Sequence, residues 1–261
     1  MSTLKDKGAV VTGAASGIGK AIATAFIEAG AGIVLCDVNA KALDDAAREL
    51  GDRAIGRITD VSDEAQVEAA MRAARDAFGS LDIVVNCAGF GAITPLTELT
   101  AQKWQAVQAV TLGGVFYGVK HGARLMLEQG RPGVIINISS VNARQPGEGQ
   151  VAYCAAKAGV DMITRCGALE LGGRGIRVVG IAPGLVETPL TRKELENPAM
   201  RSLFLGVIPM NRPVNADEIA AAAVFLASDH ARSINGETIA IDAGSLTRGY
   251  PALLTGLKKA S

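Results

Sequence analysis

The chain has 261 residues, enough for one large domain or two small ones, and its 26 basic residues balance its 26 acidic residues. The balanced charge, the lack of a basic cluster and an aromatic content of 4% argue against a nucleic-acid partner. Residues 1–7 contain no apolar stretch of signal-peptide length, and no run in the chain reaches the roughly 18 apolar residues that a membrane span needs. These features predict a soluble, cytoplasmic protein with no membrane partner.

Cysteine and histidine are too few and too scattered to indicate a disulfide framework or a metal site. The cysteines have no paired spacing, and they lie among apolar or small residues at Cys36, Cys87, Cys154 and Cys166. This pattern predicts buried free thiols. The chain has two histidines, and neither has a second ligand at a zinc-binding spacing, so we expect no metal.

Short apolar runs of strand length alternate with longer segments of helical spacing. The strand-like runs cover residues 9–11, 32–36, 54–58, 83–85, 134–138, 178–181 and 238–241. Between the first two, apolar residues recur at helical spacing from Ile18 to Ala29, and Gly30 follows as a C-cap. Nearly continuous apolar strands are typical of a parallel sheet buried on both faces. The pattern predicts one α/β domain over residues 1–261, a doubly wound Rossmann fold with a seven-stranded, mainly parallel sheet and helices on both faces.

The first strand-like run leads into a glycine-rich loop, and a helix follows. The loop reads Thr12-Gly13-Ala14-Ala15-Ser16-Gly17-Ile18-Gly19. Glycines permit a tight turn and a close approach to a pyrophosphate, which lies at the positively polarised N-terminus of the helix. The spacing G-x-x-x-G-x-G differs from the common G-x-G-x-x-G fingerprint and lacks the Gly-Lys-Ser/Thr ending of a nucleoside-triphosphate loop. Its place between a strand and a helix predicts a dinucleotide site.

An acidic residue, Asp37, ends the second strand-like run, eighteen residues after Gly19. At this place a carboxylate accepts hydrogen bonds from the adenosine ribose hydroxyls. It would repel a 2′-phosphate, and Ala14 and Ala15 supply no compensating base, so we predict NAD in preference to NADP. The sequence leaves open the alternative that Asp37 only caps the next helix.

Tyr153 and Lys157 stand four residues apart, and Ser140 precedes Tyr153 by thirteen residues. Positions i and i+4 share one face of a helix, so the ammonium can lie beside the phenol and favour its ionised form. The hydroxyl of Ser140 can hydrogen-bond an oxygen that gains or loses charge. The three residues together predict proton transfer to or from a substrate oxygen. The alternative is a solvent-exposed helix face that carries one Tyr and one Lys.

The glycine loop, Asp37 and the Tyr-Lys pair together resemble the short-chain dehydrogenase/reductase family over residues 5–244. Four more segments resemble family motifs, namely Asp60-Val61, Asn86-Cys87-Ala88-Gly89, Ile138-Ser139-Ser140 and Pro183-Gly184-Leu185-Val186-Glu187-Thr188. The resemblance implies that Tyr153 is the acid and base, that Lys157 lowers its pKa and binds the nicotinamide ribose, and that Ser140 holds the substrate oxygen.

The resemblance also implies a set of cofactor-binding residues. Besides Tyr153 and Lys157, these are Gly13, Ser16, Gly17, Ile18, Gly19, Asp37, Val38, Asp60, Val61, Asn86, Ala88, Gly89, Ile138, Pro183, Gly184, Val186 and Thr188. By this likeness Val186 offers its backbone, and Thr188 its hydroxyl, to the carboxamide of nicotinamide.

The chain departs from the family pattern at Thr111, where the family usually has the asparagine of an Asn-x-x-Gly-x-Phe run. In the family this asparagine shapes a helix distortion, and its main-chain carbonyl holds a water linked to the lysine. Thr111 keeps the carbonyl, and its hydroxyl can bond back to an upstream carbonyl. We therefore place Thr111 among the catalytic residues and expect the relay to survive.

Segment 185–212 resembles the family's lid over the substrate and is predicted to be a long irregular insertion rich in apolar residues. The predicted wall residues of the substrate pocket outside it are Phe90, Ile93, Val141, Gln145, Pro146 and Gln150. Arg144 and Arg192 are the nearest candidates for holding a carboxylate, and each is expected to be solvated. The pocket therefore predicts a fairly apolar ketone or secondary alcohol as the small-molecule partner.

The tail of residues 245–261 is also apolar and is expected to cover its own pocket or to reach into a neighbouring subunit. Its apolar residues are Tyr250, Leu253, Leu254 and Leu257. The resemblance implies a homotetramer, built partly through the helix that carries Tyr153 and through the last strand.

The sequence thus predicts an NAD-dependent oxidoreductase that interconverts a secondary alcohol and a ketone. The alternatives are a 3-oxoacyl-[acyl-carrier-protein] reductase, a steroid or sugar-alcohol dehydrogenase, and a non-catalytic dinucleotide-binding regulator. The carrier-protein role usually goes with NADPH and a basic patch, so Asp37 and the neutral net charge argue against it. The presence of Tyr153 and Lys157 argues against the regulator.

Overall fold

Seven parallel strands form the central sheet, in the order β3-β2-β1-β4-β5-β6-β7, in the computed structural model, which describes residues 3–189, 191–249 and 251. The strands are β1 (Gly8–Thr12), β2 (Gly32–Asp37), β3 (Ala54–Ile58), β4 (Ile83–Asn86), β5 (Gly133–Ile138), β6 (Ile176–Pro183) and β7 (Thr238–Ile241). Strands β1 and β4 are buried along their whole length, whereas the edge strand β3 is mostly exposed. All the strand pairings are parallel, which confirms the predicted Rossmann fold.

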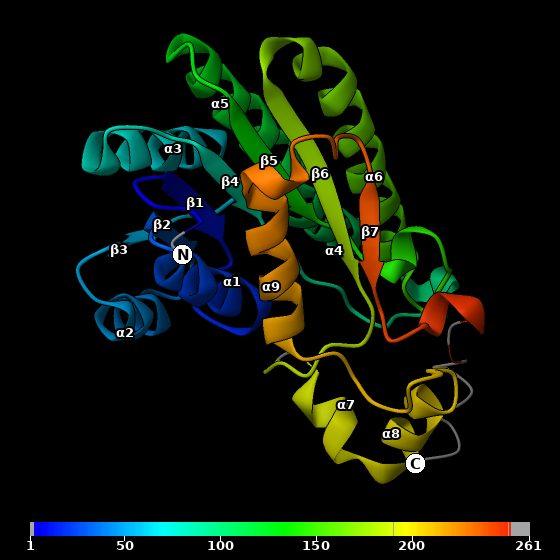
Figure 1. Ribbon diagram of the computed structural model, residues 1–261. Helices are drawn as coiled ribbons and strands as arrows, with labels where there is room; N and C mark the ends of the chain where they lie inside the picture. Colours follow the sequence, from blue (N-terminus) through cyan, green and yellow to red (C-terminus); the bar gives the residue numbers. More distant parts are fainter. Residues whose placement is uncertain (1–2, 190, 250, 252–261) are drawn as a thin grey trace.

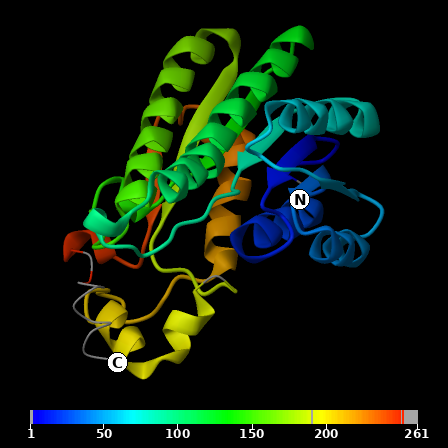
Figure 2. The same ribbon diagram turned by 180° about the vertical axis from the view of Figure 1, so that it is seen from behind.

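Helices cover both faces of the sheet (Figures 1 and 2). One face carries α1 (Gly17–Glu28), α2 (Ala40–Leu50) and α9 (Ala216–Ala227). The other carries α3 (Glu64–Phe78), α4 (Ala101–Gln108), α5 (Gly114–Glu128) and α6 (Val151–Leu171). The strand order reverses between β1 and β4, so the carboxyl ends of these strands flank the crevice where ligands of open α/β sheets bind.

Polar residues at the expected places begin and end the helices. The side chain of Asn39 accepts from Ala42 N at the start of α2, and Asp63 accepts from two backbone N–H groups at the start of α3. Gly79 ends α3 in the left-handed conformation that glycine adopts without strain. These local signals fix the start of α2 and both ends of α3.

Segment 185–212 is not the irregular insertion that the sequence predicts. It contains α7 (Arg192–Glu196) and α8 (Pro198–Leu205), because the Asn197 side chain caps α8 and Pro198 occupies its first turn. Met200 and Phe204 of α8 pack with Leu185 and Leu203 in a cluster separate from the main core. Both helices lie beyond the carboxyl ends of β6 and β7 (Figure 1). The predicted apolar residues outside the described part of the chain are Leu190, Tyr250, Leu253, Leu254 and Leu257.

The cysteines are all free, as predicted, but they differ in burial. Cys36 is buried, Cys87 and Cys154 are half-buried, and Cys166 is exposed, so the prediction of a buried thiol is wrong for Cys166, which α6 turns outward. No group of three or more His, Cys, Asp or Glu side chains in the described ranges is placed to hold a metal ion. Among the helices of the described residues, none combines the length and apolarity needed to cross a membrane, and the cytoplasmic location stays a prediction.

Candidate active site

Two adjoining cavities open at the carboxyl edge of the sheet. The larger, of about 580 Å³, lies over the glycine loop, and the smaller, of about 400 Å³, lies beside α8. The residues that line both cavities are Gly89, Phe90, Ser140, Tyr153, Gly184, Val186 and Thr191. These residues mark the place where a ligand in one cavity would meet a ligand in the other.

The glycine loop joins β1 to α1 at the floor of the larger cavity. Gly13 has a φ of +67°, and a Cβ at Gly19 would lie 2.1 Å from the Gly13 carbonyl oxygen, so a side chain at Gly19 cannot be accommodated. Ser16 is the N-cap of α1, and its side chain makes no capping hydrogen bond. The first N–H groups of α1 therefore keep their capacity to bind an anion, which suits a dinucleotide pyrophosphate.

Asp37 connects the end of β2 to the glycine loop. Its Oδ2 accepts from Ala15 N at 3.1 Å, and its Oδ1 accepts from Asn39 N at 3.0 Å. Asn39, not Asp37, is the N-cap of α2, so capping does not account for the carboxylate. Asp37 and Asp60 are two of the charged residues that line the larger cavity, and Lys157 is the third.

Tyr153 and Lys157 point from α6 toward the cavities. Lys157 is 3% exposed, its Nζ donates to the Ile138 carbonyl oxygen at 2.7 Å, and this nitrogen lies 5.6 Å from the centre of the Tyr153 ring. Burial lowers the pKa of Lys157 to about 8, because the charged form loses its hydration. The alternative of a solvent-exposed helix face is therefore wrong for this lysine.

Ser140 and Ser139 follow β5 and turn to different sides. The Ser140 hydroxyl accepts from Asn142 N at 3.1 Å and donates to Asn142 Oδ1 at 3.3 Å. It lines both cavities, whereas Ser139 lines only the larger one and donates to the Lys157 carbonyl oxygen at 3.5 Å. The spacing argument that selects Ser140 over Ser139 agrees with this geometry.

Two predicted site residues, Thr111 and Asn86, lie behind the cavities without lining either. Thr111 lies in a π-helical turn (Ala109–Gly113), which is a helix distortion at the expected place. Its hydroxyl accepts from Phe90 N at 3.1 Å and donates to Phe90 O at 3.0 Å, and the expected bond to a carbonyl of its own helix is replaced by these contacts. Asn86 donates across the sheet to Asn137 Oδ1 at 2.8 Å.

The other predicted cofactor-binding residues come from the carboxyl ends of six strands, β1 to β6, and from α6. They line the larger cavity, and they are Gly13, Ser16, Gly17, Ile18, Gly19, Asp37, Val38, Asp60, Val61, Ala88, Gly89, Ile138, Tyr153, Lys157, Pro183, Gly184, Val186 and Thr188. Seven segments that are far apart in the sequence thus line one cavity.

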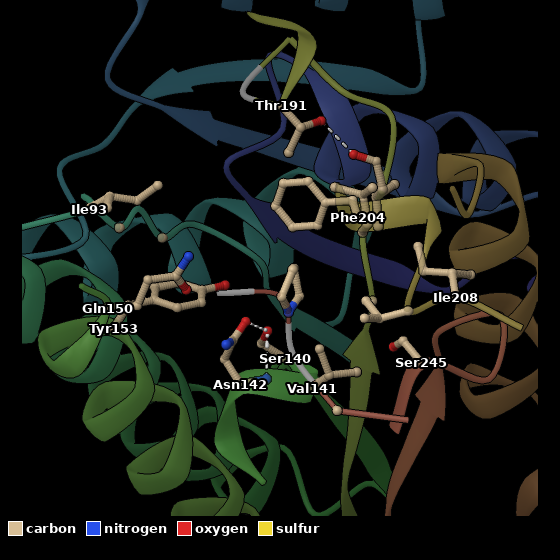
Figure 3. A pocket seen from close by; sticks show the side chains of 18 of the residues that line it. Ile93, Ser140, Val141, Asn142, Gln150, Tyr153, Thr191, Phe204, Ile208 and Ser245 are labelled. Carbon is tan, nitrogen blue, oxygen red and sulfur yellow. Dashed lines mark hydrogen bonds between the residues drawn. The ribbon is translucent and has the colours of Figure 1, made fainter. Parts of the chain in front are cut away.

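Polar and apolar side chains face one another across the smaller cavity (Figure 3). Ser140, Asn142 and Tyr153 lie on one side, and Phe204 and Ile208 face them from the other. Of the predicted wall residues, Phe90, Ile93, Val141 and Gln150 line this cavity.

Two of the remaining predictions for the smaller cavity are wrong, and two agree with the structure. Gln145 and Pro146 do not line it. Arg144 is exposed, as expected, although its Nη2 donates to the Thr238 carbonyl oxygen at 2.5 Å and its Nε lies 3.6 Å from Asp161 Oδ2. Arg192 is exposed, as expected.

Sequence reasoning misses the lining residues Asn142 and Thr191, whereas Ser245, Gly249 and Pro251 line the cavity in agreement with the expected tail over its own pocket. Thr191 connects the segment after β6 to α7, since its hydroxyl donates to the Val186 carbonyl oxygen at 2.6 Å and accepts from Thr188 N at 3.1 Å. A second threonine three residues after Thr188 is a signal that could have revealed Thr191. No comparable pattern points to Asn142.

Comparison with known proteins agrees with this geometry. A family model described as enoyl-(acyl carrier protein) reductase matches residues 13–245. D-threitol dehydrogenase of Mycolicibacterium smegmatis is 45% identical over 244 residues, which cover 92% of this chain and 93% of that protein. 3beta-hydroxysteroid dehydrogenase 1 of Eggerthella lenta is 39% identical and covers 97% of this chain and 98% of its own length.

A solved structure from Agrobacterium tumefaciens with bound NADP has the same fold. It is 34% identical to this chain, covers 95% of it and 99% of its own chain, and gives a TM-score of 0.87. Similarity of this extent, together with the glycine loop and the Tyr-Lys pair, shows more than a common fold. The chain belongs to the short-chain dehydrogenase/reductase family, and it is an NAD(P)-dependent oxidoreductase that acts on CH–OH groups.

Proposed function

We propose that this protein is an NAD-dependent enzyme that interconverts a secondary alcohol and a ketone on a fairly apolar small molecule. One observation carries the proposal. Tyr153 and Ser140 line both cavities where these meet, and Lys157 lines only the larger one. A proton-transferring group belongs at this border, because the reacting carbon must approach the cofactor while its oxygen stays within reach of the phenol.

The roles of the three residues follow from their positions. A nicotinamide ring in the larger cavity would give or take the hydride. Ser140 can turn its hydroxyl from Asn142 to the substrate oxygen and hold it by a hydrogen bond. Tyr153 gives this oxygen a proton during reduction and removes the proton during oxidation. Lys157, fixed by the Ile138 carbonyl, binds the ribose beside it and favours the ionised phenol.

The charge around Asp37 supports NAD over NADP. Asp37 and Asp60 bring two carboxylates to the larger cavity, and Ala14 and Ala15 bring no cation to the loop. A 2′-phosphate near Asp37 would face a like charge in a partly buried place, whereas two ribose hydroxyls can donate to it. The Agrobacterium tumefaciens relative holds NADP, so the preference has to be measured for this chain.

The smaller cavity supports an apolar or alicyclic substrate. Phe90, Ile93, Phe204 and Ile208 present apolar side chains to it. The similarity to a hydroxysteroid dehydrogenase agrees with a substrate whose carbinol belongs to a ring. Phe204 of α8 and Ile208, which follows this helix, supply the part of the lid that contacts the cavity.

A second substrate class is a short polyol. The amides of Asn142 and Gln150 lie on the side of the cavity that carries Ser140 and Tyr153, where they can bind hydroxyls next to the reacting carbon (Figure 3). The similarity to D-threitol dehydrogenase favours this class.

Exposed apolar side chains on two helices support a homotetramer. Phe116 on α5 and Met162 and Leu169 on α6 are 49%, 55% and 85% exposed in the single chain. Side chains of this kind are commonly buried between subunits. Light scattering of the purified protein gives its mass in solution, and a monomer would contradict this assignment.

A cofactor and substrate panel tests the proposal. Alicyclic ketones, steroid ketones, short ketoses and acyl thioesters are each incubated with NADH and, in parallel, with NADPH, and consumption of the reduced cofactor is followed by absorbance. We expect the largest kcat/KM with NADH and an alicyclic ketone. A preference for ketoses would select the polyol class, and a preference for thioesters with NADPH would select the acyl-carrier reductase. Tight NADH binding without turnover of any compound would select the regulator.

A further inference from the structure

The loop that follows β4 passes against the ring of Tyr153. A Cβ added at Gly91 would lie 3.0 Å from Cγ and Cδ2 of Tyr153 and 3.2 Å from its Cβ. Such distances are shorter than ordinary carbon–carbon contacts. The main chain at Gly91 therefore rests directly on the phenol ring, with no room for a side chain between them.

Thr111 holds this loop in place. Its fully buried hydroxyl bonds both the N–H and the carbonyl oxygen of Phe90, the residue before Gly91. On the other side of Phe90, a Cβ at Gly89 would lie 3.5 Å from Lys157 Nζ. Phe90, which Thr111 holds, thus lies between Gly91, which packs on Tyr153, and Gly89, which lies near Lys157 Nζ.

The two cavities differ in their contact with this loop. Gly89 and Phe90 line both, whereas Gly91 lines only the smaller one. A change at Gly91 can therefore affect the larger cavity only through the Tyr153 ring, which lines both.

We propose that Gly91 is a positioning residue that seats the Tyr153 ring, and that Thr111 is the anchor that keeps the loop from yielding. The inference rests on the proposed function, since it assumes that Tyr153 transfers the proton. A Cβ at Gly91 must displace either the ring or the loop. Because two hydrogen bonds to a buried hydroxyl resist movement of the loop, the ring moves. Displacement of a reacting group by a fraction of an ångström lowers turnover strongly.

Gly91→Ala tests the first part of the proposal, with Gly173→Ala as the matched control, because a Cβ at Gly173 meets nothing within 4 Å. We expect Gly91→Ala to lower kcat by roughly tenfold or more, with the KM for NADH within about twofold of wild type. Gly173→Ala should change neither. A kcat for Gly91→Ala within about twofold of wild type would overturn the proposal, and so would an equal loss of NADH affinity, which indicates general damage to the loop.

Thr111 is tested in combination with Gly91. Thr111→Val removes both hydrogen bonds to Phe90 at nearly constant volume, so the loop can yield and Gly91→Ala should cost less than about threefold in that background. Thr111→Ser keeps the hydroxyl, so in that background Gly91→Ala should again lower kcat by the full factor, roughly tenfold or more. Independent, multiplicative losses in the Thr111→Val background would rule out Thr111 as the anchor.

A crystal structure of cofactor-free Gly91→Ala separates failure of this inference from failure of the proposed function. A displaced Tyr153 ring beside an unmoved loop supports the inference even if no substrate is turned over. An unmoved ring beside a displaced loop refutes it even if the wild-type enzyme is active. Absence of turnover by the wild-type protein counts against the proposed function alone.

Discussion

The two cavities are built from different kinds of structure. The larger is formed by the ends of buried strands and by a glycine loop whose backbone leaves no room for side chains. The smaller is closed by α8, whose Met200 and Phe204 belong to a small cluster outside the main core, and by the start of the tail at Ser245. The larger cavity, which is the dinucleotide side, is therefore part of the main core. The smaller cavity, which is the substrate side, is closed by peripheral segments whose residues can be substituted without disturbing that core.

The largest expected effect falls at the border between the two cavities. Tyr153→Phe removes the proton-transferring hydroxyl and keeps the ring that rests on Gly91. We expect turnover to fall by about 10²–10⁴-fold with NADH binding unchanged. Steady-state rates and NADH titration by fluorescence check both statements, and a near-native rate would remove Tyr153 from the mechanism.

A pair of phenylalanine substitutions sharpens the comparison of the two sides. Phe26 of α1 is fully buried in the main core, and Phe204 of α8 is 8% exposed in the small cluster. Phe26→Ala should lower the free energy of unfolding by about 3–5 kcal/mol. Phe204→Ala should lower it by less than about 2 kcal/mol because its cluster is small and peripheral.

The effect on the substrate KM should be larger for Phe204→Ala than for Phe26→Ala, which is the opposite of the order expected for stability. We expect Phe204→Ala to raise this KM by roughly threefold to tenfold, because the removed ring is one of the apolar side chains that line the smaller cavity. Phe26→Ala should leave it unchanged at a temperature where the variant is folded. Equal stability losses in denaturant titrations, or an unchanged KM for Phe204→Ala, would erase the distinction between the two sides.

Cofactor choice is the next largest effect. Asp37→Asn keeps an oxygen acceptor and removes the charge, whereas Asp37→Ala removes both. Loss of a charged hydrogen-bond acceptor should raise the KM for NADH roughly tenfold in Asp37→Ala. Both variants should discriminate less against NADPH than wild type. The ratio of kcat/KM for the two cofactors measures this preference, and an unchanged ratio in both variants would refute the role of Asp37.

The smallest effect concerns the stability cost of Lys157. Burial lowers its pKa from 10.5 to about 8, which corresponds to an unfavourable contribution of about 3 kcal/mol to the folded state at neutral pH. Lys157→Met should abolish the proposed chemistry yet stabilise the cofactor-free protein by about 1–2 kcal/mol, after allowance for the lost hydrogen bond to Ile138. Denaturant titration of both proteins checks the sign.

The difference in the free energy of unfolding between Lys157→Met and the wild-type protein should depend on pH in a defined direction. Below pH 8 the lysine is protonated in both the folded and the unfolded state, so its full cost is present. Between about pH 8 and 10.5 the unfolded state binds more protons than the folded state, so the wild-type protein gains stability as the pH rises. The advantage of Lys157→Met should therefore shrink over this window, and an advantage that grows would contradict a depressed pKa.

Much of the dinucleotide side is predictable from the sequence because each residue there has a local signal. The loop at Gly13 needs positive φ and close backbone approach, and Asp37 ends an apolar strand. Such signals depend on neighbouring residues only. The seven strands follow from apolar runs in the same way.

The substrate side is less predictable because its residues meet only through tertiary packing. Asn142 lines the smaller cavity through its place after Ser140, whereas Gln145, three residues later, does not. Arg144 is held by the Thr238 carbonyl on β7, a contact between residues 94 positions apart that no local pattern indicates. The helices of segment 185–212 escape notice because they are short, although the Asn197 cap and Pro198 mark the start of the second one.

Hydride transfer at the border of the two cavities is the central claim, and isotope transfer measures it most directly. NADH deuterated at both hydrogens of the reactive ring carbon is incubated with the best ketone of the panel, and the alcohol is analysed by mass spectrometry. We predict one deuterium on the carbinol carbon for each NADH consumed, and a rate of deuterium transfer about 10²–10⁴-fold lower in Tyr153→Phe. Consumption of NADH that leaves no deuterium in the alcohol would contradict the account.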